Sequence, residues 1–233
     1  MRALTPRQVL AADPGPPDYG AIVDGHWLRE PLSIAFAHGR QAHVPYLVGS
    51  TSNEASVFGL MGFDAAALRA RFGIDVAAMR PYYEGAGPID DPELLRRVQT
   101  DFLFTSAALG MAGLASRAAP AWAYHFGYLP PADRGHLAGA PHCADMPYIF
   151  GPLPDASAES RALAKQEQDY LYDFMTLGDP NGPRLPHWPR VVPGRIDPQI
   201  FAAPSGPQPP LSRPAIRAWY ARWQHRTNIA IQP

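Results

Sequence analysis

The chain has 233 residues, of which 46% are hydrophobic and 18% charged, and its formal net charge is −1. This length suits one large domain or half of a bigger one, and the near-neutral charge gives no attraction for nucleic acid or an anionic membrane surface. No apolar run approaches the roughly 20 residues of a membrane span, and the first residues lack the apolar core of a signal peptide, so we expect no membrane association and a cytoplasmic location.

Helical and strand patterns alternate along the chain. Caps, turn residues and hydrophobic spacing predict a short helix over 4–10, a Pro/Gly loop over 11–20 and a short strand over 21–25. A helix over 31–39 and a buried strand over 44–50 follow. A short helix between Asp64 and Gly73 precedes a long helix over 91–119 that Asp91 caps.

The second half continues this alternation. Large aromatic residues at every second position from Trp122 to Tyr128 predict a strand, with His125 packed on its other face. A helix over 157–177 ends at Gly178, a late strand includes Ile200 and Phe201, and a final amphipathic helix covers 216–223. The pattern favours an α/β fold, yet only about three strands are recognisable, which indicates an incomplete sheet.

Two polar residues follow predicted strands and suit acid–base chemistry. Glu54 comes directly after the strand over 44–50, and His142 lies on a Gly/Pro-bracketed loop after the aromatic strand. A carboxylate that accepts an imidazole N–H fixes the tautomer of the histidine, so the other ring nitrogen can act as a general base. The pattern alone leaves open that Glu54 is a solvated loop residue and that His142 only packs.

Other interpretations of the same region also stay open. His136, His142, Cys143 and Asp145 lie close enough in sequence to suggest a transition-metal site, but their spacing is not a usual chelating pattern. Cys143, the single cysteine, excludes an internal disulfide, and its position beside His142 on an extended segment disfavours it as a nucleophile because adjacent side chains point apart. His26, His38 and His43 lie in a polar stretch with no carboxylate at ligand spacing, and we expect His187 and His225 to be surface residues.

The motifs of a complete serine hydrolase are missing from this sequence. It contains neither the G-x-S-x-G elbow that exposes a nucleophilic serine nor the H-G-G-G oxyanion loop. His142 therefore has no recognisable nucleophile to activate within these 233 residues.

Several blocks in order resemble the type-B carboxylesterase family, which includes the cholinesterases and bacterial para-nitrobenzyl esterases. The segments are V-D-G at 23–25, A-F-A-H-G-R at 35–40, V-P-Y-L-V-G-S-T-S-N-E at 44–54, G-A-P-H-C-A-D-M-P-Y-I-F-G at 139–151, and G-D-P-N-G followed by W-P between 178 and 189. The resemblance covers roughly residues 1–225 and is specific because the blocks follow one another in the family's order.

The resemblance implies the C-terminal part of an α/β-hydrolase fold over residues 1–233, with an incomplete, mostly parallel mixed sheet and flanking helices. It assigns Glu54 as the triad acid, His142 as the triad base and Asp145 as a supporting group where the family usually has Glu. At the position of Cys143, the family usually has a small residue, often Gly. The family's serine and oxyanion loop lie upstream of every block present here.

The resemblance also implies the function. We expect a carboxylic-ester hydrolase without metal or organic cofactor, acting on a small-molecule ester, whose isolated chain is inactive because it lacks the nucleophile. Its partners would be the missing N-terminal half or a second copy of the chain. The alternative is a non-catalytic, esterase-derived binding or interaction module, or a truncated fragment.

Overall fold

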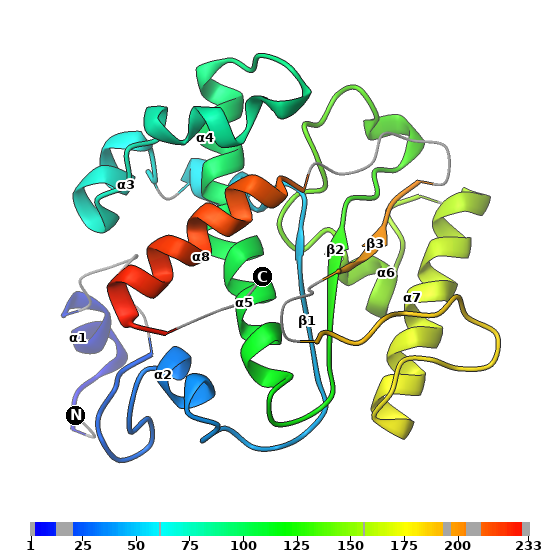
Figure 1. Cartoon of the computed structure of the whole chain (residues 1–233), viewed down its shortest axis with the longest axis horizontal. Coiled ribbons are helices and arrows are strands. Elements are labelled where there is room, and N and C mark those ends of the chain that lie inside the picture. The colour runs from blue at the N-terminus through cyan, green and yellow to red at the C-terminus, as the bar shows by residue number, and fades with distance from the viewer. Residues whose placement is uncertain are drawn as a thin grey trace.

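Three parallel strands form the centre of the computed structural model, which describes residues 3–12, 21–60, 62–155, 157–192, 197–203 and 211–229 (Figure 1). They are β1 (Tyr46–Thr51), β2 (Ala121–Phe126) and β3 (Gln199–Phe201), in the order β1-β2-β3. Tyr46 pairs with Ala121 and Thr51 with Phe126, so the first two strands end at the same level. The strands over 44–50 and 121–128 and the late strand are thus confirmed, each within a few residues.

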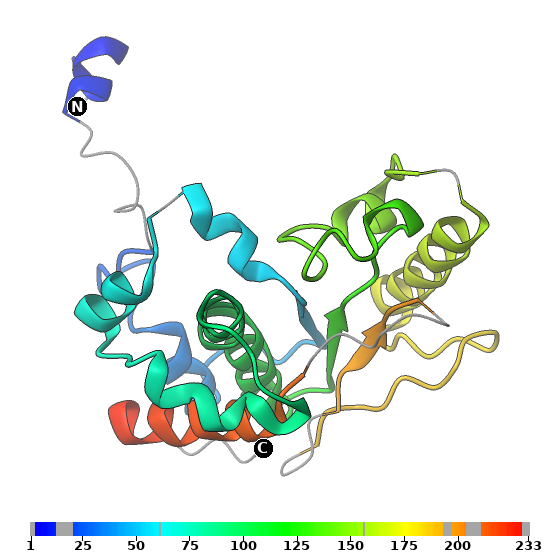
Figure 2. The same cartoon turned by 90° about the horizontal axis from the view of Figure 1, so that it is seen from above.

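Helices cover both faces of this sheet, as the view from above shows (Figure 2). The small residues Ala121 and Ala123 of β2 pack with α5 and α8, and the large residues Trp122 and Phe126 pack with α7 on the opposite face. Burial of both faces explains why the strands are apolar at nearly every position. A third apolar cluster lies between α3, α4 and α8, outside the sheet.

The helices follow the caps that the sequence predicts in most places. Their bounds are α1 (Pro6–Ala11), α2 (Leu32–Ala37), α3 (Ala65–Phe72), α4 (Asp91–Thr100), α5 (Ser106–Ala115), α6 (Met146–Phe150), α7 (Ala158–Leu177) and α8 (Arg213–Thr227). Shorter 3-10 segments cover Glu54–Leu60, Ala77–Tyr82, Glu84–Ala86 and Pro131–Asp133. Asp64 caps α3 through its side chain, and Gly73 and Gly178 end α3 and α7 in the left-handed conformation.

The long helix expected over 91–119 is interrupted, which corrects that prediction. A π-helical turn, Asp101–Thr105, separates α4 from α5, and Asp90 rather than Asp91 caps the N-terminus by accepting a hydrogen bond from the backbone of Glu93. Such a turn inserts an extra residue and shifts the side chains that follow. In this register the Thr105 hydroxyl accepts a hydrogen bond from Ser50 of β1, 3.1 Å away.

The strand expected over 21–25 is absent, so that prediction is wrong. The Asp24 carboxylate accepts hydrogen bonds from three backbone N–H groups, those of residues 26, 27 and 28, at 2.8–3.1 Å. A side chain that captures neighbouring backbone donors favours a turn over strand pairing. Most of the loop expected over 11–20 lies outside the described residues.

No helix within the described ranges is both long and apolar enough to cross a membrane. The three described strands pair only in parallel, in agreement with a mostly parallel α/β sheet.

Candidate active site

The loops that follow β1 and β2 run side by side at the carboxyl end of the sheet. The backbone N–H of Ser52 donates to the carbonyl of Phe126 at 2.8 Å, and that of Asn53 donates to the carbonyl of Ala140 at 2.9 Å. The Ser52 hydroxyl in turn accepts a hydrogen bond from the backbone N–H of Ala140 at 2.9 Å. These bonds place the segment after β1 directly against the loop that carries His142, which is where open α/β sheets form their sites.

Glu54 is buried in this junction, with 5% of its side chain exposed. Its Oε1 accepts a hydrogen bond from the backbone N–H of Thr51 at 2.7 Å, and its Oε2 is hydrogen-bonded to Nδ1 of His142. The next backbone N–H, that of Ala55, donates to the hydroxyl of Thr100 on α4 at 3.2 Å. The carboxylate is therefore held from both sides, with one oxygen committed to the imidazole.

His142 is more accessible than its partner, with 36% of its side chain exposed. Its backbone N–H donates to the Ser56 hydroxyl at 2.8 Å, and its ring lies against Phe104, with centroids 5.3 Å apart. Phe104 belongs to the π-helical turn, so this helical irregularity supplies one wall of the site. With Nδ1 engaged by Glu54, Nε2 is the ring nitrogen left for proton transfer.

The residue after His142 has an unusual backbone conformation. Cys143 has φ = 62°, in the left-handed region that favours glycine. This explains physically why a glycine suits the position. The Cys143 thiol is exposed, and desolvation together with the charges of Asp145 and Glu54 raises its pKa, which makes it a poorer nucleophile.

Asp145 is buried near the histidine loop and is held by β2. The Tyr124 hydroxyl donates to its carboxylate at 2.8 Å, and burial with the nearby Asp145 charge raises the pKa of Tyr124. Tyr124 itself covers Gly49 so closely that a Cβ on Gly49 would lie 2.4 Å from its ring. The structure therefore links Asp145 to the sheet.

The alternative metal cluster is not assembled. Within the described ranges no three His, Cys, Asp or Glu side chains are arranged to hold a metal ion, although His136, His142, Cys143 and Asp145 are all described.

His125 is buried in β2, as expected, and six other histidines are exposed: His26, His38, His43, His136, His187 and His225. Burial lowers the pKa of His125 to about 4, and its Nδ1 lies 3.2 Å from the Ser50 hydroxyl. It is a neutral residue of the core.

Sequence reasoning missed four residues that shape the site. Ser52 and Ser56 flank Glu54 and bond the histidine loop through their hydroxyls, and their position just after a strand is a signal that was present in the sequence. Thr100 ends α4 and Phe104 lies in the π-helical turn, 46 and 50 positions after Glu54, and no local pattern marks them.

Comparisons with known proteins agree with this architecture. Residues 90–203 match the model of the carboxylesterase family. The chain is 28% identical over 195 residues to a fumonisin B1 esterase of Sphingopyxis macrogoltabida, covering 75% of this chain and 35% of that protein. It is 26% identical over 181 residues to a para-nitrobenzyl esterase of Bacillus subtilis, covering 72% of this chain and 36% of that protein.

A solved structure shows the same relationship. A carboxylesterase from Geobacillus stearothermophilus superposes with a TM-score of 0.68 and 28% sequence identity, over 91% of this chain and 47% of that one. The chain thus spans between about a third and a half of the length of these relatives. The α/β architecture, the ordered blocks and these similarities agree, and together they support a relationship of this chain to the type-B carboxylesterase family.

Proposed function

We propose that this chain supplies the acid and the base of a serine-type carboxylic-ester hydrolase. The observation that carries the proposal is the hydrogen bond between Glu54 Oε2 and His142 Nδ1, formed at the carboxyl ends of two adjacent parallel strands. In this arrangement the buried carboxylate keeps the proton on Nδ1 and stabilises the imidazolium that forms during catalysis.

The reaction follows from that geometry. A serine supplied from outside this sequence attacks the ester carbonyl, and His142 Nε2 accepts the serine proton and passes it to the leaving alcohol. Water then attacks the acyl-enzyme, with His142 again as the base. We place Asp145 as a supporting group, since Tyr124 holds it in the loop three residues beyond His142.

The substrate is a small or medium-sized carboxylic ester with a short acyl or aromatic group. This assignment rests on similarity to the family, whose members in the comparison include esterases of different substrates. No step requires a metal or an organic cofactor.

The test is hydrolysis of p-nitrophenyl acetate by the chain alone and in combination with a polypeptide that carries G-x-S-x-G and the oxyanion loop. We expect no enzymatic turnover by the chain alone, and turnover in the combination that His142→Ala abolishes. Turnover by the isolated chain that is lost in His142→Ala would show that the nucleophile lies within this sequence and would refute the proposal.

The second candidate is a non-catalytic interaction module. It is favoured by the position of β1 at one edge of the described sheet, because an edge strand is a template for pairing with another strand, and residues Tyr46 to Gly49 are only partly buried. Light scattering distinguishes the two: a stable complex with a partner, with no esterase activity in any combination, favours the module.

A further inference from the structure

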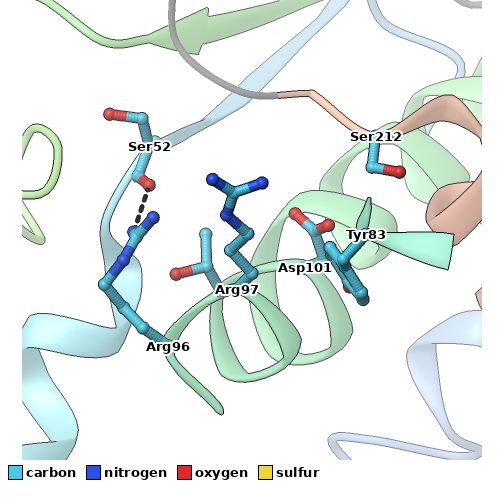
Figure 3. A pocket seen from close by; sticks show the side chains of 7 residues that line it. Ser52, Tyr83, Arg96, Arg97, Asp101 and Ser212 are labelled. Atoms are coloured by element: carbon cyan, nitrogen blue, oxygen red, sulfur yellow. Dashed lines mark hydrogen bonds between the residues drawn. The ribbon is translucent and has the colours of Figure 1, made fainter. Parts of the chain in front are cut away.

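The segment that carries Glu54 is anchored to helix α4 by an arginine. Arg96 Nη1 donates to the backbone carbonyl of Ser52 at 3.0 Å and to the side-chain oxygen of Asn53 at 3.3 Å. Figure 3 shows Arg96 directed at Ser52, with Arg97 beside it on the same helix. Ser52 is 4% exposed, so this guanidinium satisfies a carbonyl that water scarcely reaches.

Arg96 is itself fixed by a carboxylate one turn earlier. Its Nε and Nη2 donate to the two oxygens of Glu93 at 2.6 and 2.8 Å, a bidentate pair with 13% of the arginine side chain exposed. Paired, charge-assisted hydrogen bonds of this kind hold the planar guanidinium in one orientation. Because Glu93 fixes the guanidinium, the remaining donor, Nη1, is held in position to bind the Ser52 carbonyl.

The anchored segment connects both members of the acid–base pair. Ser52 and Asn53 bond the backbone of Ala140 in the histidine loop, and Glu54 follows immediately. A Cβ on Gly139 would lie 3.1 Å from the same Ser52 carbonyl oxygen that Arg96 binds. Displacement of this carbonyl would thus disturb the Glu54 side and the His142 side of the site together.

Arg97 offers an internal comparison. It also binds Glu93, through Nε at 2.7 Å. Both arginines line a cavity of about 10 Å³, together with Ser52, Asp101 and Ser212 (Figure 3). No hydrogen bond joins it to Ser52 or Asn53 within the described part of the chain, whereas Arg96 bonds both. The two arginines share a helix, a charge and a carboxylate partner, and they differ in the contact with the site.

We propose that Arg96 is a positioning residue for the acid–base pair, holding the Ser52–Asn53 segment so that the Glu54 carboxylate meets Nδ1 of His142. This inference rests on the proposed function of Glu54 and His142, and it adds a residue 42 positions from Glu54 that the family comparison does not assign.

The experiment measures which ring nitrogen of His142 carries the proton, using the ¹⁵N chemical shifts of the purified full chain at pH 8.5. A carboxylate at Nδ1 favours the Nδ1–H tautomer, whereas free imidazole prefers Nε2–H. His142→Gln identifies the signals, and the buried His125 is an internal reference. Thermal unfolding verifies that each variant is folded.

We expect His142 to be mainly Nδ1–H in the unaltered chain and in Arg97→Met, and to become a mixture with at least a third Nε2–H in Arg96→Met. Arg96→Lys, which retains one donor for the Ser52 carbonyl, restores most of the Nδ1–H form. If Arg96→Met does not fold, Arg96→Gln takes its place, because it also lacks the bidentate pair with Glu93.

Two results would overturn the inference. One is a folded Arg96→Met or Arg96→Gln chain whose His142 keeps the tautomer of the unaltered chain. The other is an equal change in Arg97→Met, which would mean that any weakening of α4 has this effect. The proposed function fails separately, if His142 in the unaltered chain is mainly Nε2–H.

Discussion

Gly139 lies against Ser52 so closely that a Cβ on Gly139 would be 2.8 Å from the Ser52 hydroxyl oxygen. That hydroxyl accepts the backbone hydrogen bond of Ala140, so it cannot move away without loss of this bond. We expect Gly139→Ala to lower the free energy of unfolding by about 1–3 kcal/mol, because the side chain overpacks the junction of the two loops.

Chemical denaturation monitored by circular dichroism measures this effect. Gly59→Ala is the matched control, since a Cβ at Gly59 meets nothing within 4 Å. Equal stabilities of Gly139→Ala and Gly59→Ala would show that the two loops are not in close contact.

The left-handed conformation of Cys143 gives a second prediction. A side chain in this region costs about 1–2 kcal/mol relative to glycine, so we expect Cys143→Gly to stabilise the chain by about 1 kcal/mol or less once the added freedom of the unfolded glycine is subtracted. Cys143→Ala retains the strain and lacks this gain. Denaturation curves of the two variants compare them directly, and a more stable alanine variant would argue against a left-handed residue at this position.

A buried carboxyl outside the site controls the pH dependence of stability. Glu167 on α7 is 4% exposed, its Oε2 has no hydrogen-bond partner, and burial and the nearby Asp145 raise its pKa to about 9. It lines an otherwise mostly apolar cavity of about 300 Å³ between β1, Tyr124 and Trp188. The folded chain therefore keeps this carboxyl protonated where the unfolded chain, with an ordinary pKa, releases the proton.

The sign of the effect follows from this difference in bound protons. The stabilising contribution of Glu167 is complete below its unfolded pKa of about 4.5 and is lost as pH rises toward 9. The buried Asp101, with a pKa raised to about 7 by burial, acts in the same direction but only at lower pH. Between pH 7 and 8 we expect Glu167 to lower the free energy of unfolding by about 1.4 kcal/mol per pH unit, and the slope becomes smaller as the pH approaches 9.

Unfolding at pH 7, 8 and 9 checks this prediction. Glu167→Gln removes the ionisable group and flattens the dependence, whereas Asp169→Asn, an exposed change on the same helix that removes an ion pair with Lys165, leaves it intact. An unchanged slope in Glu167→Gln would mean that Glu167 is already ionised in the folded chain.

Much of the fold follows from local sequence because parallel strands and capped helices carry strong local patterns. The alternation from Trp122 to Phe126 predicts β2 and its two faces, and Asp64 and Gly73 predict both ends of α3. The π-helical turn was not predictable, since Asp101–Thr105 continues the spacing of an ordinary helix. The strand over 21–25 was predicted wrongly because the Asp24 carboxylate accepts three short-range backbone hydrogen bonds, which outweigh the strand preference of Ile22 and Val23.

The candidate site, like the fold, could be predicted from the sequence only in part. Positions after strands single out Glu54 and His142 as candidates, and the family resemblance gives them their proposed roles. Their contact joins residues 88 positions apart and depends on the register of β1 with β2, which no single segment specifies. The Arg96 contact with Ser52 spans 44 positions and is set by the packing of α4, so local sequence held no signal for it.

We infer that Glu54 and His142 act as one acid–base unit in ester hydrolysis. The most direct test is the rate of p-nitrophenyl acetate hydrolysis, measured with the nucleophile-bearing part of the Bacillus subtilis para-nitrobenzyl esterase joined to this chain, for Glu54→Gln, His142→Ala and the double variant. We predict that Glu54→Gln lowers kcat by about 10³–10⁴-fold and that the double variant is no slower than His142→Ala, because members of a catalytic unit are not additive. An unchanged kcat in Glu54→Gln, or multiplicative losses in the double variant, would contradict the claim.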